Sequence, residues 1–197
     1  MPIEFIEIET TDLPVTVYNF QVEDNHTYFV ADMGLLVHNA SPIYEKQRIE
    51  QLESYSNSEL SSEGSSIHPN VPEWKSGDPC KGVMEVGGAK ISLQSGASGP
   101  GGFLKTLPGG KGSGLNAQIP THVEGHAASI MIQEKITTAE LYINKPPCNT
   151  GAMCRFNLNR ILPEGYTLNV HFPDISGNEV IWQFKGGILK WIEVGGK

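Results

Sequence analysis

Residues 121–143 read THVEGHAASIMIQEKITTAELYI, and this stretch decides the fold. Its first part, residues 122–134, carries apolar residues at helical spacing, which predicts a helix with one apolar face. The apolar residues at this spacing are Val123, Ala127, Ile130 and Met131. The second part, residues 138–143, is dense in apolar residues and predicts a strand. A helix followed closely by a strand indicates an α/β fold, in which helices pack against a sheet.

The residues on both sides of this stretch predict further strands and a second helix. Gly87-Gly88 is a good two-residue hairpin signal between two alternating segments. The predicted strands cover residues 81–86, 89–94, 138–143, 166–172 and 180–184, and the second helix covers residues 154–162. Residues 188–194 are a candidate edge strand, whereas residues 95–114 are glycine-rich and irregular. This order favours an α/β fold with a five-stranded mixed sheet and helices packed on it.

The first 79 residues differ from the remainder of the chain. Residues 3–39 alternate apolar and polar side chains and predict two or three short strands, a β segment too small to bury a core of its own. A short helix is predicted next, because Ser41 can cap it and Pro42 suits its first position. Residues 55–79 are acidic and rich in Ser and Pro, which is typical of a linker. The predicted divisions of the chain are residues 1–40, 41–79 and 80–197.

Charge separates the same parts of the chain. The 197 residues carry a net charge of −8. Residues 1–80 hold 3 basic and 14 acidic residues, whereas residues 81–197 hold 11 basic and 8 acidic residues. Only the second part, at +3, suits a phosphate backbone. We expect neither a membrane span nor a cleavable signal peptide, because no long apolar run occurs and no basic patch follows Met1.

The cysteines point to a metal. Cys80, Cys148 and Cys154 are too few for a disulfide scaffold, and an odd count favours a reducing compartment or a metal site. Two of them, Cys148 and Cys154, combine with His122 into a three-ligand zinc set, which leaves a fourth position open to water as in catalytic sites. All three lie near predicted helix N-termini, whose partial positive charge favours thiolates. The alternative is a capping histidine with two buried thiols, and we expect Cys80 to be a spare thiol.

Glu124 lies two residues after His122 and is the candidate catalytic acid–base. A carboxylate at this helix start can take a proton from the activated water and pass it to a substrate nitrogen. His126 lies one turn after His122, but a metallopeptidase needs Glu directly after the first histidine, where Val123 stands. We therefore disfavour a peptidase and interpret His126 as a packed residue or one that supports the ligands.

The pattern H-x-E followed by P-C-x-x-C is the signature of zinc deaminases. His122 and Glu124 match its first half, and Pro147 with Cys148 begins its second half. Five residues, rather than two, separate Cys148 from Cys154, so the loop that carries the second thiolate is longer. The longer loop weakens the assignment of Cys154 as a zinc ligand more than the assignment of Cys148.

Several further motifs stand in order between residues 81 and 185. They are Gln94-Ser95-Gly96 with Gly99-Pro100, THVEGHAA from Thr121, LYINKPPC ending at Cys148, and LPEGYTLNV from Leu162 to Val170. On these motifs the segment resembles the DddA-like bacterial deaminase toxins. The resemblance implies a cytidine-deaminase-like fold and zinc-dependent deamination of cytosine to uracil in DNA. It also implies an interbacterial polymorphic toxin, a secreted effector that acts in the cytoplasm of the target cell and is held in check by a cognate immunity protein.

The N-terminal segment carries a second resemblance. Asp24 to Val30 and Val37-His38-Asn39-Ala40 are similar to the last strands of a pretoxin Hint (intein-like) domain. In that family a terminal His-Asn pair supports cyclisation of the asparagine and release of the chain. The resemblance implies the C-terminal remnant of a Hint domain in a longer toxin, with cleavage after Asn39 left open because the nucleophile of such a domain is not in this sequence.

The candidate substrate-binding residues are Asn116, Ser95, Gly96, Phe103 and Pro147. The resemblance implies that Asn116 holds the sugar or base, and the alternative is a turn residue. Ser95 and the glycines that follow form either a lid or a plain loop, and Phe103 and Tyr142 either stack on a base or pack in the core. The candidate phosphate contacts are Lys105, Lys111, Lys145, Arg155 and Arg160, which otherwise form a solvated face.

Three functions remain open from the sequence. The first is DNA cytosine deamination, on single-stranded or double-stranded DNA. The second uses the same site on RNA or free cytidine. The third is a non-catalytic toxin module in which zinc has only a structural role.

Overall fold

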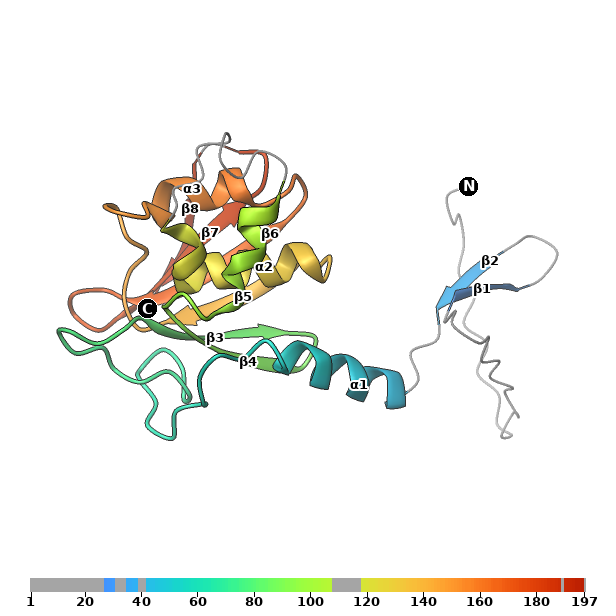
Figure 1. Ribbon diagram of the computed structural model, residues 1–197, viewed down its shortest axis with the longest axis horizontal. Coiled ribbons are helices and arrows are strands. Elements are labelled where there is room, and N and C mark those ends of the chain that lie inside the picture. The colour runs from blue at the N-terminus through green and yellow to red at the C-terminus, as the bar shows by residue number, and fades with distance from the viewer. Residues whose placement is uncertain (1–26, 31–34, 39–41, 108–117, 189, 197) are drawn as a thin grey trace. The chain divides into compact units, whose positions relative to one another are not determined.

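The computed structural model describes residues 27–30, 35–38 and 42–196, apart from 108–117 and 189 (Figure 1). The chain divides into two compact units, residues 1–45 and 46–197. In the first unit, β1 (Thr27–Val30) pairs antiparallel with β2 (Leu35–His38). These are two of the short strands that the sequence predicts, and the expected strands before residue 27 lie outside the described residues.

The second unit is built on a mixed six-stranded sheet in the order β4-β3-β5-β6-β7-β8. Its strands are β3 (Lys81–Val86), β4 (Ala89–Gln94), β5 (Thr138–Ile143), β6 (Thr167–Pro173), β7 (Glu179–Lys185) and β8 (Ile192–Gly196). Strands β5 and β6 run parallel and every other neighbouring pair is antiparallel. The α/β class is confirmed, but the expected five strands are six, because the candidate edge strand forms and pairs with β7.

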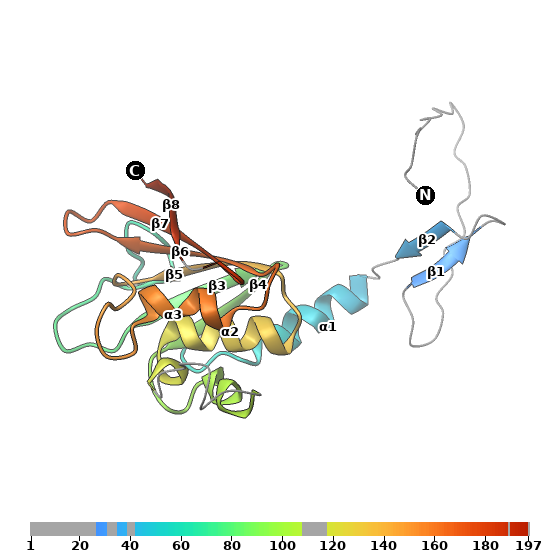
Figure 2. The ribbon, with the colours of Figure 1, turned by 90° about the horizontal axis from the view of Figure 1, so that it is seen from above.

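Two helices cover one face of this sheet. Figure 2 shows α2 (Val123–Gln133) and α3 (Cys154–Ile161) side by side on the same side of the strands. Apolar residues of α2 and β5, among them Ile130, Met131 and Leu141, are fully buried between these layers. Burial of this apolar surface is the main favourable term that holds the helices on the sheet. The two helix starts therefore have a fixed position at one end of the sheet.

The opposite face of the sheet carries polar and aromatic side chains. Tyr142 of β5 lies between the rings of His68 and His171, with ring centroids 4.7 and 4.3 Å away. His171 also contacts the carboxylates of Glu140 and Glu179, each at 2.8 Å. Of the two alternatives for Tyr142, stacking on a base and packing, the structure shows packing with these rings.

The β3–β4 hairpin has the bounds that the sequence predicts. Gly87 and Gly88 connect the strands with φ angles of +54° and +83°, which are typical of a type I′ turn and are accessible to glycine without strain. The described part of the glycine-rich segment, residues 95–107, is less irregular than expected, since a 3₁₀ helix, η1, covers Pro100–Thr106. Pro100 starts this turn and Leu104 is fully buried beneath it, so tertiary packing fixes a glycine-rich segment. A second short turn, η2 (Ile119–Thr121), leads into α2.

The acidic segment after α1 (Pro42–Glu53) packs against the sheet edge and belongs to the second unit. Asn57 forms three hydrogen bonds to the free edge of β4: its N–H donates to Ser92 O (3.0 Å), its side-chain amide donates to Gln94 O (2.8 Å), and its Oδ1 accepts from Gln94 N–H (2.7 Å). Val71, further along the segment, is fully buried. The segment that the sequence indicates as a linker therefore closes an edge of the sheet.

The described helices are all too short or too polar to cross a membrane.

Candidate metal centre and active site

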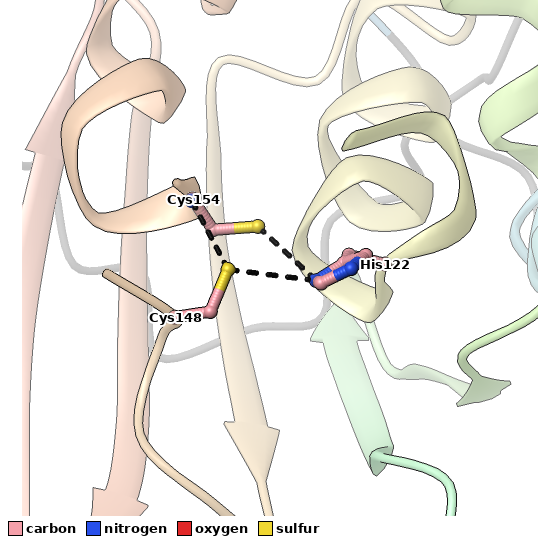
Figure 3. A group of neighbouring side chains, drawn as sticks. All are labelled: His122, Cys148 and Cys154. Atoms are coloured by element: carbon pink, nitrogen blue, oxygen red, sulfur yellow. Dashed lines mark hydrogen bonds between the residues drawn. The ribbon is translucent and has the colours of Figure 1, made fainter. Parts of the chain in front are cut away.

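The three predicted ligands come together at the helix starts. His122 directly precedes α2, Cys148 lies in the loop that follows β5, and Cys154 is the first residue of α3 (Figure 3). Their donor atoms all lie within 4.8 Å of one another. The parallel β5–β6 pair with α3 in its crossover brings the cysteine loop to the end of the sheet at which α2 begins.

The spacing of these donor atoms fits a tetrahedral zinc ion. The Nδ1 atom of His122 lies 3.7 Å from the sulfur of Cys148 and 3.6 Å from the sulfur of Cys154. A tetrahedral ion with Zn–S near 2.3 Å and Zn–N near 2.0 Å sets a sulfur and a nitrogen about 3.5 Å apart. One imidazole and two thiols are also a donor set that zinc prefers. These residues could therefore hold zinc and leave one coordination position for a further ligand.

The surroundings of the two thiols favour the thiolate form of Cys148, which is the form that binds a metal ion. The hydrogen bond between the two thiols lowers the pKa of Cys148 to about 4, and contact with His122 adds to this effect. The same hydrogen bond, together with burial, raises the pKa of Cys154. The first N–H of α3, on Cys154, also donates to the Cys148 sulfur at 3.4 Å. Cys148 is therefore the thiol that ionises first, beside a helix N-terminus.

The loop between the cysteines is compact, although it is longer than in the deaminase signature. Met153, the residue before α3, has a φ of +54°, and Gly151 has a φ of +62°. These left-handed residues turn the chain back on itself, so the three extra residues are absorbed without moving Cys154 away from His122. The long Cys–Cys spacing is compatible with a three-ligand cluster.

Glu124 is buried in the first turn of α2, with 3% of its surface exposed. Burial raises its pKa above the ordinary glutamate value, and the charge of His122 only partly opposes this. A carboxyl group with a raised pKa holds a proton more readily than an ordinary glutamate, which suits a proton-transfer role.

A cavity of about 300 Å³ lies at this end of the sheet, and Glu124, His122 and Cys148 form part of its wall. The predicted residues Ser95 and Gly96 line the same cavity. Three further lining residues, Cys80, Thr121 and Pro146, were not predicted from the sequence, and Lys145 was predicted only as a phosphate contact. Cys80 and Lys145 sit at the ends of strands that lie beside each other in the sheet, a neighbourhood that the linear sequence does not show.

The other predicted substrate residues have different positions. Pro147 is buried, and its neighbour Pro146 lines the cavity instead. Phe103 is half-buried in η1 and is not part of the cavity wall among the described residues. Asn116 and Lys111 lie outside the described residues. Of the candidate phosphate contacts, Lys145 alone is among the described lining residues.

Arg155 packs on aromatic rings. Its guanidinium carbon lies 4.7 Å from the ring centroids of both Trp182 and Trp191, and 5.8 Å from that of Phe156. Cation–π contacts of this kind fix a guanidinium group in place. Lys105 and Arg160 are exposed in η1 and α3.

His126 connects α2 to the glycine-rich segment that forms one cavity wall. Its side chain is fully buried, and its Nδ1 accepts a hydrogen bond of 2.9 Å from the N–H of Gly101. A Cβ atom at Gly99 or Gly101 would lie 2.3 or 2.7 Å from the imidazole, so only glycine allows this approach. Burial lowers the pKa of His126 to about 4, which keeps the ring neutral. The structure thus agrees with a packed, supporting residue.

The fold and these side chains define a deaminase-type α/β domain, and comparison with known proteins gives its family. The model of the SCP1.201-like deaminase family matches residues 88–187, half of the chain. This chain belongs to the SCP1.201-like deaminase family. Comparison with curated proteins and with solved structures finds no match. The expected deaminase family is confirmed, whereas the DddA-like identity and the Hint remnant stay predictions.

Proposed function

We propose that the protein is a zinc-dependent deaminase that converts cytosine to uracil in DNA. The observation that carries the proposal is the convergence of four groups at one end of the sheet, three of which line the same cavity. An imidazole and two thiols, His122, Cys148 and Cys154, have the spacing of zinc ligands, and the carboxyl group of Glu124 lies in the same wall. This is the arrangement of residues that hydrolytic removal of an amino group from a pyrimidine requires.

A zinc ion held by these three residues would supply a Lewis acid that activates water for attack on C4 of the base. Glu124 accepts the proton that this water loses and delivers it to N3 of the ring. Glu124 then takes the remaining proton from the hydroxyl group added at C4 and passes it to the departing amino group, so that water and cytosine become uracil and ammonia. The buried position and raised pKa of Glu124 suit a group that must take up and give back protons in one cycle.

DNA is the proposed substrate on two grounds. Residues 81–197, which include the site, carry a net charge of +3 in a chain that is acidic overall. The motifs that resemble DddA-like toxins also favour cytosine in DNA. The same resemblance supports a role as an interbacterial toxin that is delivered into a target cell and bound by an immunity protein.

The test is a deamination assay with matched substrates. The purified full chain, loaded with one equivalent of zinc, is incubated with single-stranded DNA, double-stranded DNA, RNA and free cytidine, and uracil is measured by mass spectrometry. We expect uracil in DNA, loss of activity on chelation and recovery on addition of zinc. A chain that binds zinc but deaminates none of these substrates would contradict the proposal and favour a non-catalytic zinc module.

Two variants separate the metal from the fold. Cys148→Ser is expected to bind less than a tenth of the native zinc and to lose activity to the same extent. Lys90→Ala, an exposed side chain on β4, serves as the matched control and retains both. Full zinc binding by Cys148→Ser would remove this residue from the ligand set.

A further inference from the structure

A second and larger cavity adjoins the candidate active site. It measures about 580 Å³, against about 300 Å³ for the first, and Lys145 and Pro146 belong to the walls of both. Its far wall comes from two separate segments, one that includes Trp74 and one that includes Asp174. A free nucleoside would occupy only the first cavity, so the second has room for a neighbouring part of a longer substrate.

Trp74 offers an aromatic surface in this second cavity. Its side chain keeps 41% of its surface exposed, which is unusual for so large an apolar group. The indole N–H donates a hydrogen bond of 2.9 Å to the carbonyl of Asp78, and a turn closed by Asp78 N–H to Lys75 O (3.0 Å) supports that contact. The ring is therefore held by its edge, and since Lys145 lies over one face, the opposite face is the one on which a base could stack.

The charged side chains that line this second cavity, among the described residues, are one lysine and two carboxylates. The ammonium group of Lys145 lies 5.1 Å from the centroid of the Trp74 ring and on the side shared with the first cavity. The charged residues of the second cavity also include Glu73 and Asp174, and the Asp174 carboxylate already accepts from the N–H groups of Ser176 (2.7 Å) and Asn178 (2.9 Å). Among the described lining residues Lys145 is the one cation, so it is the group that a phosphate would contact, and the neutral base is assigned to Trp74.

We infer that this second cavity binds the nucleotide next to the target cytosine in a single strand of nucleic acid, with its base stacked on Trp74 and the connecting phosphate at Lys145. The inference rests on the proposed function and deepens it, because it makes the substrate a polynucleotide. Stacking of a base on an aromatic side chain contributes about 1–3 kcal/mol and tolerates any base. Trp74 lies outside the matched family region, residues 88–187, so the segment before that region supplies part of the substrate site.

The test measures binding in a Glu124→Gln background, in which substrate is not consumed. The probes are a fluorescein-labelled single-stranded DNA 12-mer with one cytosine among thymines, the same sequence in RNA, and the mononucleotide dCMP as a competitor. Trp74→Ala is expected to weaken binding of the 12-mer between about 5-fold and about 150-fold and to leave dCMP binding unchanged. Trp74→Phe, which keeps a ring, is expected to restore most of the affinity.

Lys145→Ala tests the phosphate contact separately. It is expected to reduce the slope of log affinity against log salt by about 0.7, the value for one phosphate on a single strand. The matched controls are Leu60→Ala, another exposed apolar residue of the same segment, and Lys90→Ala, and both are expected to bind like the parent chain. Unchanged 12-mer affinity in Trp74→Ala, or an equal loss for dCMP, would overturn the inference.

The outcomes also separate this inference from the proposed function. A native chain that deaminates nothing, yet binds the 12-mer in a Trp74-dependent way, would support the second cavity and contradict the deaminase proposal. If the native chain is active and neither Trp74→Ala nor Trp74→Phe changes its affinity or rate, the deaminase proposal is supported and the second cavity is contradicted. Trp74-dependent binding of the RNA probe alone would support the cavity and replace DNA with RNA.

Discussion

Two glutamates at opposite ends of helix α2 show how differently the same side chain is used in one domain. Glu124, in the first turn, is buried in the candidate active site, and burial raises its pKa. Glu134 follows the last residue of the helix. Burial alone would raise the pKa of Glu134 as well, but hydrogen bonds from Tyr55 and Arg48 outweigh it and lower the pKa below the ordinary value.

The difference runs against the helix dipole, which favours a negative charge at the N-terminus and disfavours it at the C-terminus. Around Glu134, Tyr55 donates at 2.6 Å and Gln51 at 3.2 Å, and Arg48 forms an ion pair with the same carboxylate. These donors come from α1 and the residues just after it, so Glu134 fastens that segment to the domain. Glu134 is therefore kept ionised where it holds structure, whereas burial of Glu124 favours its protonated form.

The largest effect is expected from Glu124→Gln. Because the amide cannot carry the proton, the deamination rate should fall by about 10²- to 10⁴-fold, while zinc binding and the thermal midpoint stay at or above the native values. Steady-state rates on the DNA substrate, with zinc measured by atomic absorption, check this. A variant that keeps more than a tenth of the native rate would take Glu124 out of the proton-transfer role.

The reverse pattern is expected from Glu134→Gln, which serves as the matched partner. Loss of the charge weakens the bonds to Tyr55 and Arg48, and the free energy of unfolding should fall by about 1–2 kcal/mol. The deamination rate of the folded protein should not change. Urea denaturation followed by circular dichroism measures the first quantity. Equal stability of the two proteins would show that this cluster does not hold the segment in place.

A smaller effect, in pH dependence, sharpens the same contrast. The folded-state pKa of Glu134 lies below its unfolded value of about 4.5, so its stabilisation is complete above that pH and is lost as the pH falls through the folded pKa. The stability difference between the native chain and Glu134→Gln should therefore be constant from pH 7 to about pH 5 and shrink at lower pH. Urea midpoints at several pH values test this, and a difference that grows on acidification would contradict it.

The sequence predicts the elements with strong local signals. The β3–β4 hairpin and β5 have the expected bounds, because Gly87-Gly88 and a dense apolar run leave few alternatives. The cluster of His122, Cys148 and Cys154 could be predicted for a similar reason, since the residue types and order of a metal site follow from chemistry that tolerates few substitutes. The H-x-E pair also lies at a helix start, as its spacing indicates.

What the sequence does not predict depends on contacts between distant segments. The 3₁₀ helix after Pro100 contains two glycines and reads as a loop, and it forms because Leu104 is buried and His126 holds Gly101. Lys145 and Trp74 are 71 positions apart in the chain and meet only in the folded domain. A local sequence pattern does not predict contacts between residues that are far apart in the chain.

The pairing of Asn57 with β4 has a practical consequence for the design of shortened versions of this chain. A recombinant fragment cut to residues 88–187 would begin after β3, the strand that joins β4 to β5, and would also lack Asn57. Its β4 would then have no hydrogen-bonded neighbour on either side, a condition that promotes aggregation. Expression vectors for this domain should therefore start at or before residue 46.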